Sequence, residues 1–168
     1  MNPAARLFER HHLGVFRYFR AATRSTSRAE DLTQEVFLRV VRALPRYRAE
    51  EREESWIFTI ARNALLNERR ARARSVAVAD LEEGDRPTRV PVIGRIDLAR
   101  ALLRLDPLDR DVFLLREVGG LTYDEAAQAC EITPNAVRSR IYRTRLALRS
   151  ALARSPRRAN QLRKEFES

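Results

Sequence analysis

The sequence predicts an all-α protein with two small helical domains joined by a flexible linker, the second of which contains a helix-turn-helix. Apolar residues recur at helical spacing in both halves of the chain, and the alternation typical of strands is almost absent. Between the halves lies a stretch that has Gly84, Pro87, Pro91 and Gly94 but no periodicity. A chain of 168 residues can form one ordinary domain or two small ones, and this interruption favours two.

The first domain is expected in residues 1–75. Its clearest helix opens at Ser27, which has capping-box spacing with Glu30, and Pro45 stops it. The apolar face of this helix has a residue at every fourth position, namely Leu32, Val36, Val40 and Leu44. Earlier apolar residues predict one or two further helices packed onto it, namely Leu7, Phe8, Val15, Phe16 and Phe19.

A further helix of this domain is expected from Ser55, as N-cap, to the basic run that ends at Arg74. Trp56 in its first turn is expected to pack in the core. His11 and His12 are expected on a solvated helix surface rather than as metal ligands.

Residues 76–95 are expected to form the linker and residues 96–168 the second domain. In that domain a helix is expected from residue 96 to 105. Asp106 then places a good N-cap before Pro107, and the helix that follows ends at Gly119-Gly120.

The helix-turn-helix is predicted from two further caps. Thr122 and Glu125 form a second capping-box pair, which opens a short helix. Thr133 and Pro134 then open a longer helix, and only residues 130–132 separate the two.

The second helix of this motif has a core face and an outward face. At 100° per residue, the core face contains Val137, Ile141, Thr144 and Leu148, and the outward face contains Asn135, Ser139, Tyr142 and Arg143. Arg138 and Arg145 flank the outward face on one edge and Arg140 on the other, where long cationic side chains can reach phosphates beside a major groove. Residues 132–164 contain no acid. A solvated basic helix is the alternative to DNA reading.

Charge and composition restrict the classes of function. The net charge of +10 indicates a polyanionic partner. An anionic membrane surface would satisfy the same charge, but no apolar run approaches the ~18 residues of a spanning helix, so no membrane insertion is expected. The amino terminus lacks the apolar stretch of a secretory signal, which predicts a cytoplasmic protein.

No cofactor, metal site or catalytic residue is expected. Cys130 is the only cysteine and, with His11 and His12, forms no spaced ligand set; it is interpreted as a small buried side chain. A nucleic-acid enzyme is disfavoured because no metal-ligand cluster, phosphate-cradling glycine loop or nucleophile-base arrangement is visible. A stand-alone helix-turn-helix regulator would need a sensor domain in the first half, where no strand-helix alternation occurs.

Three blocks of sequence resemble one family, the extracytoplasmic-function sigma factors of RNA polymerase. Residues 29–40 are similar to the polymerase-binding helix of that family, and residues 56–63 to its promoter-opening helix. Residues 109–143 are similar to its carboxy-terminal promoter domain. The blocks follow the order and spacing of the family, so the resemblance implies a protein that binds core RNA polymerase and promoter DNA and catalyses nothing.

The resemblance also implies roles for individual residues. Docking on the polymerase is implied for Asp31, Gln34, Glu35, Phe37 and Val41. Capture of an unpaired base of the minus-ten element is implied for Tyr47, Arg48, Arg62, Asn63 and Asn67. Reading of the minus-thirty-five element is implied for Ser139, Tyr142 and Arg143, beside Asn135, Arg138, Arg140 and Arg145 of the same helix. Phe37 and Val41 border the core stripe, so core packing is an equal alternative for them.

The chain departs from the family pattern at two places. The family usually has glycine in the turn of its helix-turn-helix, where this chain has Glu131. If that turn needs a left-handed residue, glutamate costs about 1 kcal/mol there. The aromatic residue common just before the tryptophan position is also absent, since Ser55 precedes Trp56. The resemblance further implies an anti-sigma factor as a partner.

Overall fold

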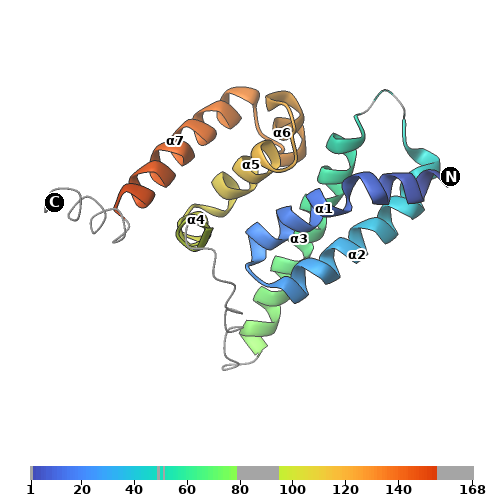
Figure 1. Ribbon diagram of the computed structural model, residues 1–168, viewed down its shortest axis with the longest axis horizontal. Coiled ribbons are helices and arrows are strands. Elements are labelled where there is room, and N and C mark those ends of the chain that lie inside the picture. The colour runs from blue at the N-terminus through green and yellow to red at the C-terminus, as the bar shows by residue number, and fades with distance from the viewer. Residues whose placement is uncertain (1, 49, 51, 79–94, 155–168) are drawn as a thin grey trace, which may run out of the picture.

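The computed structural model describes residues 2–48, 50, 52–78 and 95–154, and its regular structure in these ranges is helical without strands (Figure 1). The elements are α1 (Pro3–Thr23), α2 (Thr26–Ala43), η1 (Leu44–Arg46), α3 (Glu53–Val78), α4 (Arg95–Leu103), α5 (Pro107–Glu117), α6 (Tyr123–Cys130) and α7 (Pro134–Ala153). The all-α prediction is therefore confirmed. Both ends of the predicted linker, residues 76–95, are helical, because α3 extends to Val78 and α4 begins at Arg95. Residues 79–94 and 155–168 lie outside the described residues.

The first unit packs α1, α2 and α3 around one apolar core. One or two helices were expected before residue 27, and the structure has one, α1, which Asn2 caps by accepting from the Ala4 amide. The predicted cap of α2 is wrong by two residues. Ser25, not Ser27, accepts from the Arg28 amide at 3.2 Å and precedes the helix. The core stripe of α2 is as predicted, because Leu32, Val36 and Val40 are buried.

The predicted start of α3 is also wrong. The helix begins at Glu53 rather than after Ser55, which places two acidic side chains in its first turn, where the helix dipole favours them. Glu53 also accepts from Arg10 at 2.9 Å, and its carboxylate lies 3.2 Å from the His11 ring. His11 is 7% exposed, so the expectation of a solvated histidine is wrong for this residue, whose ring is buried between α1 and the start of α3.

The second unit, α4 to α7, has the caps that the sequence predicts. Asp106 accepts from the Leu108 amide at 3.0 Å. Thr122 and Glu125 form a complete capping box, and Thr133 accepts from the Ala136 amide. In the turn between α6 and α7, Glu131 has φ of 57°, so the left-handed residue is present without a glycine. The helix-turn-helix is confirmed together with its unusual turn.

The two units pack against each other through buried surfaces. Helix α1 contacts α5 and α4, and α3 contacts α6, and Figure 1 shows α6 beside the first unit. The ring of Phe58 on α3 lies where a side chain at Gly119 would meet it, since a Cβ there would be 3.0 Å from its Cδ1 atom. Phe58 is 3% exposed and also contacts Tyr18 edge to face. An apolar contact therefore joins the two units at the turn after α5.

Candidate functional site

A groove of about 890 Å³ lies between α1 and α2. Four of the five residues expected to dock on polymerase line it, namely Asp31, Gln34, Phe37 and Val41. Val41 is 52% exposed, whereas Phe37 is buried at 6% and contacts Phe8 edge to face. The alternative of core packing therefore describes Phe37 and not Val41. Glu35 does not line the groove and pairs with Arg39 on the same helix.

Sequence reasoning missed the apolar side chains that form much of this groove. Phe8, Leu13 and Leu38 are about half exposed and line it. Phe8 was assigned to the core because α1 is apolar on more than one side. Leu38 lies on a different side of α2 from Leu32, Val36 and Val40. This helical angle was the sequence signal that could have identified Leu38 as exposed. Exposed large apolar side chains beside polar ones are typical of a protein-binding surface.

Three of the residues expected at the minus-ten element meet at a polar pocket of about 530 Å³. Arg62, Asn63 and Asn67 line it from α3, and Gln128 and Glu131 line it from the second unit. Asn63 and Asn67 are exposed. Arg62 is buried at 8%, and its guanidinium donates to the Ala129 carbonyl at 3.1 Å. The second unit thus occupies one of the side chains expected to contact DNA.

The other two residues expected at the minus-ten element, Tyr47 and Arg48, lie between η1 and α3. The ring of Tyr47 is 4.6 Å from that of Trp56, centroid to centroid, and both side chains are partly buried. Trp56 therefore packs against the core without being enclosed by it. Arg48 is exposed. Neither Tyr47 nor Arg48 lines the pocket that contains Asn63, so the five residues form two groups.

Helix α7 presents the two faces that the sequence predicts. Val137, Ile141, Thr144 and Leu148 are buried, and the exposed side chains on the other side are Asn135, Arg138, Ser139, Tyr142, Arg143 and Arg145. Tyr142 is 66% exposed. The helical phase inferred from the sequence is therefore correct, and the outward face is open to solvent.

Several arginines of α7 are held by acids of α5. Arg140, which is 26% exposed, donates to Asp109 at 2.5 Å. Arg143 lies 3.9 Å from the same carboxylate, and Arg145 donates to Glu117 at 2.7 Å; this hydrogen bond raises the pKa of Arg145. Arg140 is the most firmly held of these arginines, so its guanidinium braces α7 against α5.

A buried carboxylate on α5 joins the two units. Arg69 of α3 donates two hydrogen bonds to Asp111, each of 2.9 Å. The Nε atom of Arg62 lies 3.9 Å from the same carboxylate, whose side chain is 2% exposed. Burial and the charge of Asp111 both raise the pKa of Tyr18. Burial likewise raises the pKa of Cys130 to about 11, against the opposing charge of Arg62.

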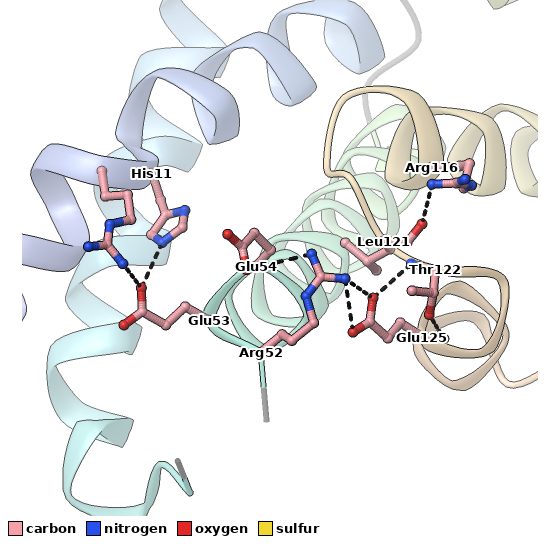
Figure 2. A network of polar contacts seen from close by, with 9 residues as sticks. His11, Arg52, Glu53, Glu54, Arg116, Leu121, Thr122 and Glu125 are labelled. Carbon is pink, nitrogen blue, oxygen red and sulfur yellow. Dashed lines mark hydrogen bonds and ion pairs between the residues drawn. The ribbon is translucent and has the colours of Figure 1, made fainter. Parts of the chain in front are cut away.

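A second polar contact between the units lies at the start of α3 (Figure 2). Arg52 donates to Glu125 of α6, at 3.0 Å to the nearer oxygen. Glu125 also accepts from the Thr122 amide at 2.7 Å as part of the capping box. Since the Arg52 side chain is 47% exposed, solvent screens this pair more than the pair at Asp111.

The described residues contain no cluster of three or more potential metal ligands and no helix long and apolar enough to cross a membrane. Two family models match the chain: Sigma-70 region 2 over residues 7–75 and Sigma-70, region 4 over residues 95–148. A chain with both regions in this order has the domain organisation of a sigma factor.

Similarity to curated proteins shows which family of sigma factors this chain resembles. The chain is 36% identical over 129 residues to the ECF RNA polymerase sigma factor SigC of Mycobacterium tuberculosis, covering 71% of this chain and 68% of the relative. It is 33% identical over 152 residues to the RNA polymerase sigma factor CarQ of Myxococcus xanthus, covering 87% of both. The chain belongs to the extracytoplasmic-function (ECF) family of RNA polymerase sigma factors. This membership favours a sigma factor over a stand-alone helix-turn-helix regulator.

Solved structures share the fold. The sigma factor RpoE of Bartonella quintana, in complex with the anti-sigma factor NepR, superposes with a TM-score of 0.78 at 21% identity, over 92% of this chain and 99% of that one. CnrH in complex with the cytosolic domain of CnrY gives a TM-score of 0.68 at 24% identity, over 90% and 88%. The first unit is called region 2 below and the second region 4.

Proposed function

We propose that this chain binds core RNA polymerase and directs it to specific promoters for transcription initiation. One observation carries the proposal. This chain of the ECF family has both an apolar groove on region 2 and an outward-facing basic helix on region 4. The first suits a protein partner and the second a DNA major groove. The proposed role is binding rather than catalysis, and it places the protein in the cytoplasm with the polymerase.

Core polymerase is proposed to dock on the groove between α1 and α2. Asp31 and Gln34 are exposed at its edge, and Val41 adds apolar surface that water covers in the free chain. An apolar centre with a polar rim is the usual anatomy of such an interface. Phe37 is a buried lining residue of the groove, and Glu35, which lies on α2 outside the groove, can exchange its ion pair with Arg39 for a contact with the polymerase.

Promoter DNA is proposed to bind both units. Residues 1–75 would capture the opened minus-ten element with Tyr47, Arg48 and the polar face of α3, and residues 96–168 would read the minus-thirty-five element with α7. The outward residues of α7 combine hydroxyl, aromatic and guanidinium groups that can contact base edges. An anti-sigma factor is proposed as a further partner, since two structural neighbours of this chain were solved in complexes, one of them with a named anti-sigma factor.

The polymerase assignment is tested by the double variant Gln34→Ala/Glu35→Ala. Gln34 is exposed, and Glu35 pairs with Arg39 on its own helix, so folding should be almost unchanged. We expect weaker binding to purified core polymerase, measured by fluorescence anisotropy, with the circular-dichroism melting temperature within a few degrees. Glu9→Ala on α1 is the control, because Glu9 is exposed and does not line the groove.

Two results would contradict the assignment. One is unchanged polymerase affinity of the double variant, and the other is an equal loss of folding and binding. Promoter-directed transcription after adding the chain to core polymerase tests the wider proposal, because a stand-alone regulator would not convert core polymerase to promoter-specific initiation.

A further inference from the structure

Tyr123 places an aromatic ring where three helices of region 4 meet. It is the first residue of α6 and is partly buried. The guanidinium carbon of Arg116, from the last turn of α5, lies 5.1 Å from the centre of this ring, and that of Arg138, near the start of α7, lies 5.4 Å from it. Both distances are within the roughly 6 Å over which a cation is attracted to an aromatic face. The three side chains therefore form one cation–π cluster that joins α5, α6 and α7.

The ring of Tyr123 is held in place by its neighbours in the chain. Arg116 also donates to the Leu121 carbonyl at 3.0 Å, two residues before the ring (Figure 2). Leu121 is fully buried, and the capping box of Thr122 and Glu125 fixes the backbone on both sides of Tyr123. The ring is therefore a platform of fixed position at the start of α6.

Arg138 keeps its charge while it contacts this ring. Its side chain is exposed, and its hydrogen bond to Asn135 has a length of 3.5 Å, longer than the usual range of about 2.7–3.2 Å. Arg140 and Arg145, by contrast, donate to carboxylates of α5, whereas no carboxylate of the described residues pairs with Arg138. An aromatic ring attracts a guanidinium without neutralising it, so Arg138 remains able to bind a phosphate.

We propose that Tyr123 is a positioning residue, which orders the Arg138 guanidinium for a phosphate contact at the minus-thirty-five element. The proposal rests on the proposed function, because it takes α7 as the helix that enters the major groove. A long side chain that is ordered before binding loses less entropy when the contact forms. Arg116 is a like charge on the same ring, so it disfavours conformers in which Arg138 turns toward α5.

The test compares Tyr123→Leu, Tyr123→Phe and Arg138→Ala in the full chain, as holoenzyme with core polymerase. Leucine removes the ring but keeps an apolar side chain at this partly buried position, whereas phenylalanine keeps a ring that attracts a cation. Phe113→Leu is the matched control, since it removes a partly buried ring of α5 that packs on the apolar core. Circular-dichroism melting of the free chains above the assay temperature must first show that each variant is folded.

Each holoenzyme is titrated against promoter duplexes at several salt concentrations. Tyr123→Leu should bind about fivefold more weakly, as expected for the loss of a cation–π contact at a partly exposed ring. It should also reduce the log-log salt slope, by up to the value of about 0.9 expected for Arg138→Ala. Preferred and base-substituted duplexes should lose affinity by the same factor, because a phosphate carries no sequence information. Tyr123→Phe and Phe113→Leu should keep the slope and stay within about twofold of the unchanged chain.

The decisive measurement is the effect of Tyr123→Leu in a chain that already has Arg138→Ala. If the ring acts through Arg138, the second change should add nothing to the loss of affinity. Additive losses, an unchanged salt slope in Tyr123→Leu, or an equal loss in Tyr123→Phe would overturn the positioning role. Promoter-directed transcription by the unchanged holoenzyme separates the two proposals: its presence with any of these results rejects the positioning role alone, and its absence rejects the proposed function.

Discussion

Replacing Arg143 with alanine should relax the sequence preference of region 4 more than it weakens binding overall. Arg143 lies on the outward face of α7 beside Ser139 and Tyr142, with 63% of its side chain exposed. Its guanidinium lies 3.9 Å from the Asp109 carboxylate, and an exposed pair of this kind contributes about 0–1 kcal/mol. The guanidinium can therefore leave it and reach the edge of a guanine.

The magnitude follows from the contact that would be lost. A good bidentate contact between arginine and guanine contributes about 1–3 kcal/mol of discrimination, which is roughly 5- to 150-fold between the preferred base and a substituted one. Arg138 and Arg145 lie at the edge of the face, and Arg145 must first release Glu117. Their expected phosphate contacts carry no sequence information, so each loss should weaken all sequences alike and reduce the log-log salt slope by about 0.9.

The assay compares Arg143→Ala, Arg138→Ala and Arg145→Ala in the full chain, as holoenzyme with core polymerase. Each is titrated, at fixed salt, against the preferred promoter duplex and a set with single base changes in the minus-thirty-five element. Arg154→Ala at the end of α7 is the control, because its guanidinium contacts the Ser150 carbonyl of its own helix. Uniform weakening by Arg143→Ala, together with a changed ranking of sequences by Arg138→Ala or Arg145→Ala, would refute the assignment of the reading face.

Two further predictions concern stability. Burial alone would raise the pKa of Glu53, but its contacts with His11 and Arg10 hold this pKa below the usual value of a glutamate. Because the folded pKa is lower than the unfolded one, the stabilisation is complete above the unfolded pKa and is lost as the pH falls through the folded pKa. The free energy of unfolding in urea should thus fall between about pH 5 and pH 3 by more than it does in Glu53→Gln, and parallel curves would contradict this. Gly119→Ala should lower that free energy at neutral pH by about 1–3 kcal/mol, because its Cβ would lie 2.6 Å from the Leu115 carbonyl oxygen. Gly120 has φ of +68° and open space around it, so Gly120→Asn should change the free energy of unfolding by less than Gly119→Ala does. Equal effects of the two substitutions would show that backbone conformation rather than crowding governs this turn.

The sequence was sufficient where the determining interactions are local. The face of α7 that contains Val137 and Ile141 was correctly predicted to be buried, because helical period depends on residues a few positions apart. The cap at Asp106 and the capping box at Thr122 were also correct, since a cap satisfies amides within three residues of itself.

Errors arose where packing chose between local signals of similar strength. Ser25 and Ser27 can each cap a helix, and the structure uses Ser25. Ser55 could cap α3, yet the helix starts at Glu53, whose carboxylate meets Arg10 and the ring of His11 from α1. No pattern within α1 could show that His11 is buried, because its partner lies 42 residues further along the chain.

The sequence by itself determined the all-α class, the helix-turn-helix, the outward face of α7 and the family. Only the tertiary structure decided which side chains are free to act. Arg62 reads from the sequence as an exposed cation of a basic helix, yet it is buried against Ala129, 67 residues away, and beside Asp111. Periodicity and capping report on contacts within a few residues. The pairing of a buried carboxylate with two arginines of another unit depends on how completed helices pack, which no local pattern encodes.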